Sequence, residues 1–219
     1  MTIADRIADR TTRYAALPVF RAFADDRIPP ARFSEFLREQ AMAARWFQDL
    51  IWATTDVSEG PFAPFLARHR RVDSGHYKWA NQDVAANGLP AMSVDDLFAL
   101  ERLSTRVQMA RILAACHEAS PEKRVVILAA LESAGEVTLG GLNKYVKRHG
   151  LEKKNLYLGD HHLRLERGQH DAVADVAAAV MASTDDELLA TVDLVFDALT
   201  TMFESGGRRI YASVFEEAS

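Results

Sequence analysis

Apolar residues recur at intervals of three and four along almost the whole chain, which is the spacing of one face of an α-helix. No convincing run of alternating β-branched residues, the pattern of a strand, interrupts this periodicity. Helices that bury such faces and are joined by short connections form a bundle. The sequence therefore predicts an all-α protein, a helical bundle of about seven core helices.

Prolines, glycines and small polar residues mark where the predicted helices begin and end. Pro18 interrupts the N-terminal helical pattern, and Ser93 and Ser120 each precede a helix as an N-cap residue. Three glycines from 135 to 141 are expected to bend or divide the helix that contains them. The pattern at 94–119 is the least interrupted. The long helices are expected at 31–55, 64–88, 94–119, 122–148, 155–182 and 186–215.

The size and charge of the chain limit the class of protein. With 219 residues and no linker or internal repeat, we expect a single domain, 1–219. The chain carries 26 basic and 31 acidic side chains, so it has no general attraction for nucleic acid or for anionic lipid. Its N-terminus is too charged for a signal peptide, and no segment approaches the length of a membrane span. We expect a cytoplasmic protein whose partner is a small molecule.

A single cysteine, Cys116, restricts the chemistry of any metal site. One thiol forms neither an internal disulfide nor a thiolate cluster, and the apolar neighbours of this one predict that it is buried. A bound metal would need nitrogen and oxygen ligands, which favours iron or manganese.

The stretch NLYLGDHHLRLERGQHDAVADV, residues 155–176, contains three of the seven histidines. His162, Glu166 and His170 are spaced by four residues, and a helix advances about 100° per residue, so they fall within an arc of about 80°. The three side chains can therefore face one interior space, whereas His161 points about 100° away and is expected at the surface. The alternative is a solvated polar strip, because the surrounding residues are polar on all sides.

A second group, His69, Asp73 and His76, is spaced so that the three residues share one face of the predicted helix. Asp73 and His76 form a carboxylate-x-x-histidine pair, by which one helix of a bundle supplies both ligand types to a two-metal centre. His69 has three interpretations: a further ligand, a partner that orients a ligand, or an exposed residue beside Arg68 and Arg70. We favour the exposed position.

Two carboxylates occur on helices without histidine, in apolar surroundings where an isolated charge is costly. Glu39 lies on the helix face of Ala43, and Glu132 lies on the face of Leu128. The alternative for each is a boundary residue whose carboxylate reaches water. Glu136, one turn further on, competes with Glu132 for the interior position.

Together these patterns predict a metal site built from four helices. Carboxylates neutralise and bridge two cations, imidazoles complete the coordination, and a bundle interior excludes water. Such a supply of ligands is typical of a non-heme di-iron centre. The predicted metal ligands are Glu39, Asp73, His76, Glu132, His162, Glu166 and His170.

The motifs DSGHYKW, LAALESAGE and HHLRLERGQH, with the segments DDRIPPARFSEFLREQ and SGHYKWANQDVAANGLP, resemble the heme-oxygenase-like diiron oxidases and oxygenases over roughly residues 28–172. This resemblance implies a heme-oxygenase-like bundle that holds two non-heme iron ions and uses O2 as co-substrate. It also implies oxidation of a small amine- or carboxylate-bearing metabolite. Examples are N-oxygenation, desaturation or carbon–carbon cleavage of an amino acid or fatty acid.

Two positions depart from the motif of this family. Asp73 stands where the family has a glutamate before x-x-His. Glu166 stands where the family has an aspartate, and Gln169 stands where it has the next histidine, so that His170 comes one residue late. A longer carboxylate arm can offset the shifted histidine; otherwise the second iron binds weakly or is lost. The number of bound metal ions therefore stays open between one and two.

Other members of the same superfamily suggest alternative functions. A heme-degrading enzyme needs a histidine on its first helix, but the first histidine here is His69, so we exclude heme oxygenase. A thiaminase II relative needs a cysteine nucleophile, whereas Cys116 is expected to be buried. Three alternatives without bound iron are kept: a cofactorless oxidase resembling pyrroloquinoline quinone synthase, a thiaminase II-like enzyme of the same fold, and a non-catalytic binding protein. The substrate and the oligomeric state, with a homodimer as one option, do not follow from the sequence.

Overall fold

The computed structural model spans residues 1–219 and describes them except for 47–59, 118 and 217–219; the side chains of residues 31, 34, 35, 94, 166–176 and 209–216 are also not described. Within the described residues the chain is helical and contains no β-strand, which confirms the all-α prediction. The helices are α1 (Ile3–Ala15), α2 (Pro18–Ala24), α3 (Pro30–Arg45), α5 (Ala63–Asp73), α6 (His76–Ala86), α7 (Val94–Phe98), the 3-10 helix η2 (Leu100–Arg102), α8 (Leu103–His117), α9 (Pro121–Arg148), α10 (Asp160–Met181) and α11 (Asp186–Glu216).

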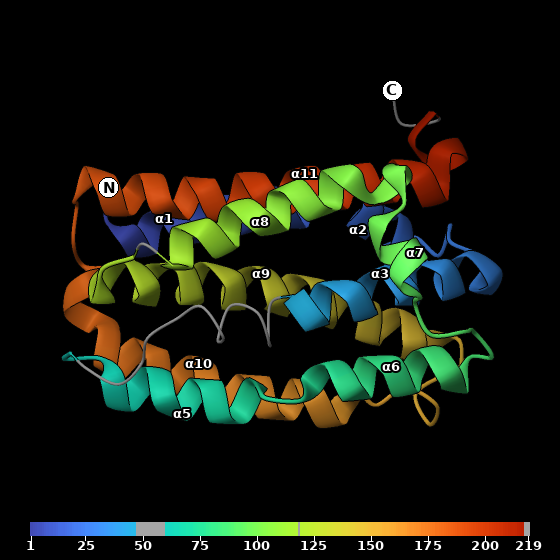
Figure 1. Ribbon diagram of the computed structural model, residues 1–219, viewed down its shortest axis with the longest axis horizontal. Helices are drawn as coiled ribbons and strands as arrows, with labels where there is room; N and C mark the ends of the chain where they lie inside the picture. Colours follow the sequence, from blue (N-terminus) through green and yellow to red (C-terminus); the bar gives the residue numbers. More distant parts are fainter. Residues whose placement is uncertain (47–59, 118, 217–219) are drawn as a thin grey trace.

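The long helices lie side by side, with most of their axes close to the longest dimension of the molecule (Figure 1). α9 packs against α1, α10 and α11, and α11 also packs against α1 and α8. α5 and α6 follow one another along the opposite side of the bundle from α11, where α5 contacts α10 and α6 contacts α3. α9 is thus the central helix, and residues on several of its faces are buried.

Local signals set several helix ends as the sequence predicts. Pro18 begins α2, where its missing N–H costs no helical hydrogen bond. The Ser93 side chain accepts a hydrogen bond from the amide of Asp96 at the start of α7, and the Ser120 side chain accepts one from the amide of Lys123 in α9. The predicted break in the helical pattern at Pro18 and the two predicted N-caps are confirmed.

The predicted helix 64–88 is wrong in one respect, because the structure divides it at Gly75. This glycine has a φ angle of 93°, in the left-handed region that residues with a Cβ avoid. Asp73 is the last residue of α5, and His76 is the first residue of α6. The two residues therefore do not share the face of one helix, and their proximity depends on the turn between two helices.

Other helix boundaries also differ from the predicted ones. The pattern at 94–119 is divided into α7, η2 and α8, because Ala99 takes an extended conformation with a ψ angle of 142°. In contrast, α9 continues for 28 residues through its three glycines, so the expected division is wrong there. α10 begins at Asp160, five residues after the expected start, which leaves the preceding residues as a loop. Of the predicted helix 31–55, residues 47–55 lie outside the described residues.

An aromatic cluster of Phe23, Phe33, Phe36 and Tyr145 packs α2 and α3 onto the last turns of α9. The rings of Phe23 and Tyr145 meet edge to face, with centroids 5.3 Å apart and planes at 80°. The buried hydroxyl of Tyr145 donates a hydrogen bond of 2.7 Å to the carbonyl oxygen of Ile28. The aromatic rings and this hydrogen bond therefore tie α2, α3 and the segment between them to the C-terminal end of α9.

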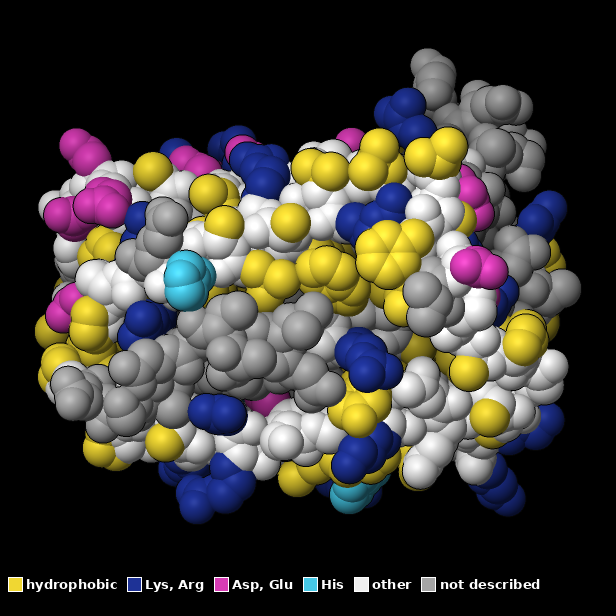
Figure 2. All heavy atoms as spheres, in the orientation of Figure 1, with side chains coloured by type: hydrophobic (Ala, Val, Ile, Leu, Met, Phe, Trp, Pro, Cys, Tyr) yellow, Lys and Arg dark blue, Asp and Glu magenta, His cyan; other side chains and the backbone are white. Residues whose placement is uncertain are grey.

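Part of the surface of the protein is apolar. Apolar side chains gather over α7, η2 and α8 (Figure 2); the large exposed ones there are Phe98, Leu100, Leu103 and Val107.

Among the described residues, α9 is long and apolar enough to cross a membrane, with 56% of that stretch buried in the bundle. The expectation that no segment approaches the length of a span is therefore wrong for α9, although the core helix of a bundle passes the same test.

Candidate functional site

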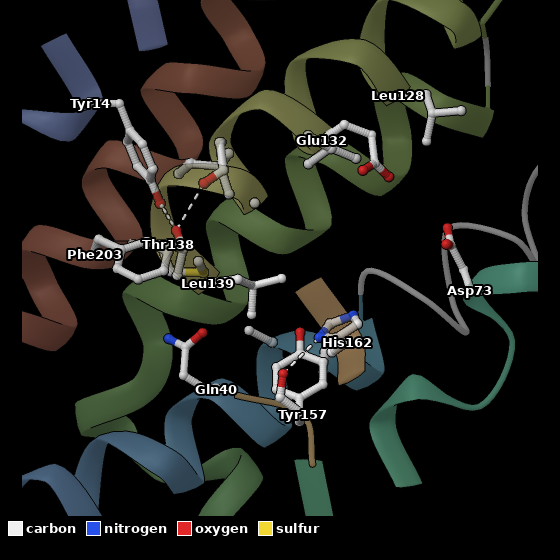
Figure 3. Close-up of a pocket in the computed structure, with 17 residues that line it drawn as sticks. Tyr14, Gln40, Asp73, Leu128, Glu132, Thr138, Leu139, Tyr157, His162 and Phe203 are labelled. Carbon is white, nitrogen blue, oxygen red and sulfur yellow. Dashed lines mark hydrogen bonds between the residues drawn. The ribbon is translucent and has the colours of Figure 1, made fainter. Parts of the chain in front are cut away.

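A cavity of about 130 Å³ lies among α1, α3, α5, α9, α10 and α11 (Figure 3). Most of its wall is apolar and comes from α3, α9 and α11. Three of its lining residues are carboxylates or a histidine, namely Asp73, Glu132 and His162, and its other polar ones are Tyr14, Gln40, Thr138 and Tyr157. A largely apolar pocket with a few converging polar groups is the usual form of a small-molecule site.

A carboxylate–histidine cluster, formed by His69, Asp73 and Glu132, lies beside this cavity. Nε2 of His69 is 2.7 Å from Oε1 of Glu132 and 3.4 Å from Oδ2 of Asp73. His69 is 3% exposed, so the favoured interpretation of it as an exposed residue is wrong. The error has a physical reason. Glu132, more than sixty residues later in the chain, binds the imidazole, and this contact offsets the free-energy cost of burying it.

A histidine pair, formed by His76 and His162, lies next to this cluster. Nδ1 of His76 is 3.2 Å from Nε2 of His162, and Nδ1 of His162 is 2.7 Å from the carbonyl oxygen of Tyr157. A carbonyl only accepts, so His162 donates from Nδ1. When both rings are neutral, His162 accepts at Nε2 from Nδ1–H of His76.

Electrostatics link the pair to the cluster. Burial, together with the nearby His162, lowers the pKa of His76 to about 3, and the charge of Glu132 opposes this shift. The His76 ring is therefore neutral at pH 7, the form in which imidazole binds a metal. The interaction between His76 and Glu132 also shows that pair and cluster form one group of ionisable side chains.

Aromatic rings hold the two imidazoles. The His76 ring stacks on Trp79, with centroids 4.6 Å apart and planes at 24°. The His162 ring lies against Tyr157, with centroids 4.5 Å apart. His161 is exposed, as predicted, and its ring meets the edge of Trp79. The orientation of both buried imidazoles is thus fixed before any ligand binds.

Asp83, on α6, anchors the loop that precedes α10. Its carboxylate accepts hydrogen bonds from the backbone amides of Leu156 and Leu158, on either side of Tyr157. Burial raises the pKa of Asp83, against the effect of these hydrogen bonds. Because the Tyr157 carbonyl binds His162, Asp83 positions that histidine through the loop.

The structure separates the remaining predicted ligands. Glu132 lines the cavity whereas Glu136 is exposed, which decides between these two glutamates. The Glu39 carboxylate accepts a hydrogen bond of 2.8 Å from Nε of Arg102, and Glu39 lines a second cavity of about 20 Å³ rather than the large one. The side chains of Glu166 and His170 lie outside the described residues, so their role stays a prediction.

The polar cavity residues Gln40 and Thr138 were not identified by the sequence analysis, and Tyr14 was assigned no role in a site. A signal for Gln40 was present, because it falls in the apolar stripe of α3 at three- and four-residue spacing from Leu37 and Ala44. An uncharged polar side chain in such a stripe lies inside the bundle. Tyr14 and Thr138 are 124 residues apart in sequence, and no local pattern predicts their contact.

The donor atoms of the cluster suit a metal ion. One imidazole nitrogen and two carboxylate oxygens, from His69, Asp73 and Glu132, lie within 4.8 Å of one another. This mixed nitrogen and oxygen set is typical of sites for iron, manganese and zinc. No protein-family model matches this chain, and no curated protein matches it, so the family resemblance stays a prediction.

Proposed function

We propose that the protein is a non-heme iron oxidase or oxygenase that uses dioxygen to oxidise a small molecule held in the cavity. The observation that supports this most is the position of the carboxylate–histidine cluster and the histidine pair, which lie together beside an apolar cavity. Burying a group of carboxylates and imidazoles in a core costs free energy, and such a group is typical of a functional site.

The residues divide between holding the metal and supporting the site. His69, Asp73 and Glu132 would hold one ion, and His76 and His162 would supply nitrogens for the same or a second ion. Ferrous iron bound there supplies the electrons that activate dioxygen. The apolar lining keeps water from the reacting molecule.

Support for the imidazoles comes from Tyr157 and Trp79. The hydrogen bond from Nδ1 of His162 to the Tyr157 carbonyl leaves Nε2 as the nitrogen with a lone pair, when the ring is neutral. Stacking on Trp79 fixes the plane of the His76 ring. Glu39 is left outside the proposed ligand set because Arg102 binds its carboxylate. Following the family resemblance, we propose an amine- or carboxylate-bearing metabolite as substrate.

A second candidate function is binding or cofactorless oxidation without a metal. The 2.7 Å hydrogen bond between His69 and Glu132 favours it, because this contact stabilises the cluster in the absence of any ion. The two candidates differ in one measurable property, which is iron uptake.

The test is metal analysis of anaerobically loaded protein, followed by measurement of oxygen uptake with a panel of small amines and carboxylic acids. Replacing Glu132 by Gln, or His76 or His162 by Ala, should lower iron affinity by about tenfold or more, as is typical when a metal-site contact is lost. Glu136→Gln and His161→Ala are matched controls, because both residues are exposed. Parent-like iron uptake in all three site variants would favour the metal-free candidate. Iron-loaded protein that consumes no oxygen would contradict the proposed oxidase or oxygenase activity.

A further inference from the structure

The Gln40 side chain brings an uncharged amide to the wall of the cavity. It is 7% exposed and lines the wall formed by α3. Its amide carries two donors and an acceptor, and no residue that the structure describes forms a hydrogen bond with it. Burying an amide in this way is unfavourable unless another molecule completes its hydrogen bonds.

A pair of hydroxyls on the same side of the cavity can also accept hydrogen bonds. The Thr138 hydroxyl donates to the carbonyl oxygen of Ala134 at 3.0 Å, so the Tyr14 hydroxyl donates its proton to Thr138 at 3.1 Å. Lone pairs on both oxygens are left to accept from a ligand. Burial raises the pKa of Tyr14, so this phenol stays uncharged.

Charge is distributed unevenly around the cavity. Figure 3 places Tyr14, Gln40 and Thr138 on one side, and Asp73 and Glu132 on the other. Among the described residues that line the cavity, none is a lysine or an arginine. A carboxylate bound at the Gln40 side would therefore be buried without a cation to neutralise it, which is strongly unfavourable.

From these contacts we infer that the cavity takes a small, largely apolar molecule with an uncharged hydrogen-bonding group, a carboxamide or an alcohol, held by Gln40, Tyr14 and Thr138. Its apolar body packs against Ala43, Leu139 and Met202, and its other end lies towards Glu132 and Asp73. This inference rests on the proposed function only for the reaction at that other end. It narrows the chemistry of the substrate: a positively charged group, where one is present, lies towards the carboxylates of Asp73 and Glu132 and not at Gln40.

Gly135 offers a way to block the cavity without disturbing its walls. It lies within α9 and lines the cavity, and a Cβ atom placed on it would have no neighbour within 4 Å. A larger side chain there enters open space. Gly140, on the same helix, also has no neighbour within 4 Å but does not line the cavity, so it provides a matched control.

The test uses titration calorimetry of the full chain, as purified and after iron removal, with three probes of similar size. Hexanamide carries an uncharged amide, hexanoate has the same shape with a negative charge, and toluene forms no hydrogen bonds. We expect the iron-free protein to bind hexanamide about tenfold more tightly than hexanoate, because only the carboxylate loses its hydration without a partner. Gly135→Leu should abolish binding of all three, whereas Gly140→Leu should not.

Recognition by Gln40 is tested with Gln40→Leu, which should weaken hexanamide by about tenfold and change toluene by less than about twofold. Gln82→Leu, at an exposed position on α6, is the control and should change neither. Thr138→Val, which removes one hydroxyl at nearly constant volume, should weaken hexanamide by about threefold and serves as a second variant should Gln40→Leu fail to fold.

The outcomes separate this inference from the proposed function. Equal or tighter binding of hexanoate to the iron-free protein, or an unchanged hexanamide affinity in Gln40→Leu and in Thr138→Val, would overturn the inference. Binding of toluene alone would also overturn it, since the cavity would then hold only apolar molecules or water. Because calorimetry on iron-free protein involves no metal, a failure of iron uptake or oxygen consumption leaves these results intact and counts only against the proposed function.

Discussion

α9 passes through two regions of opposite character within four turns. Around Tyr145, near its C-terminal end, aromatic rings pack edge to face and the one buried hydroxyl described there is hydrogen-bonded to Ile28. Around Glu132, carboxylates and imidazoles surround a cavity. The first region fills its space with apolar atoms and contributes to stability. The second gives up packing and buries ionisable groups, which destabilise a fold, so its composition has to be explained by function.

The largest expected effect comes from opening the packed region. Phe33 is fully buried in the aromatic cluster, so Phe33→Ala should lower the free energy of unfolding by about 3–5 kcal/mol. The measurement is urea denaturation followed by circular dichroism. Protein that stays folded should bind iron like the parent, because Phe33 does not line the cavity. A loss below about 1 kcal/mol would mean that the cluster is less tightly packed than its ring geometry indicates.

The second prediction concerns the ionisable region. His69→Ala should lower iron affinity by about tenfold or more, because it removes the only nitrogen donor of the carboxylate–histidine cluster described here. His149→Ala is a control, since His149 pairs with Asp26 at the far end of α9. Metal analysis and competition with a chelator measure the difference. Equal iron affinity in both variants would exclude His69 as a ligand.

A third prediction concerns pH. Because the pKa of His76 is lowered to about 3, the unfolded chain binds a proton between about pH 6.5 and 3 that the folded, metal-free protein does not bind. The contribution of His76 to stability is thus complete above pH 6.5 and falls as the pH falls through this window. His76→Phe should remove up to about one proton from the number that the chain takes up on unfolding in this window. The unfolding free energy of the variant should therefore depend less steeply on pH. Denaturation series from pH 4 to pH 7 test this, and parallel curves for parent and variant would contradict it.

The smallest expected effects come from adding a methyl group at two glycines of α9, one inside the cavity and one outside it. Gly135→Ala and Gly140→Ala should each stabilise the protein by about 0.5–1 kcal/mol, because alanine favours the helix and neither Cβ meets a neighbour. Only Gly135→Ala should weaken hexanamide binding, since only Gly135 lines the cavity. Thermal unfolding and calorimetry measure the two effects. Destabilisation by Gly135→Ala would show that the cavity is narrower than described.

The sequence predicts the fold class because helical periodicity and capping residues act locally. Ser93 and Ser120 begin helices, and Cys116 is buried, as their neighbours indicate. The break at Gly75 was missed because a glycine within a helical pattern is ambiguous: it is tolerated in α9, yet it takes a positive φ here.

The candidate site was predicted less completely than the fold. Polar residues at helical spacing identified Asp73, His76 and His162, and a carboxylate on an apolar helix face identified Glu132. The structure brings these four residues together. The burial of His69 depends on a partner from a distant helix, which periodicity does not reveal. The cavity itself depends on where side chains are small or absent, and the sequence pattern carries no information about such space.

The turn at Gly75 has a consequence for how the site assembles. Asp73 belongs to α5, which docks on α10, whereas His76 belongs to α6, which docks on α3. The distance between these two side chains is therefore set by two separate docking events, and a partly assembled bundle cannot hold them in register. If iron binds as proposed, only the completely assembled chain offers the full set of donors, so metal affinity is coupled to the last steps of folding and iron uptake reports on them.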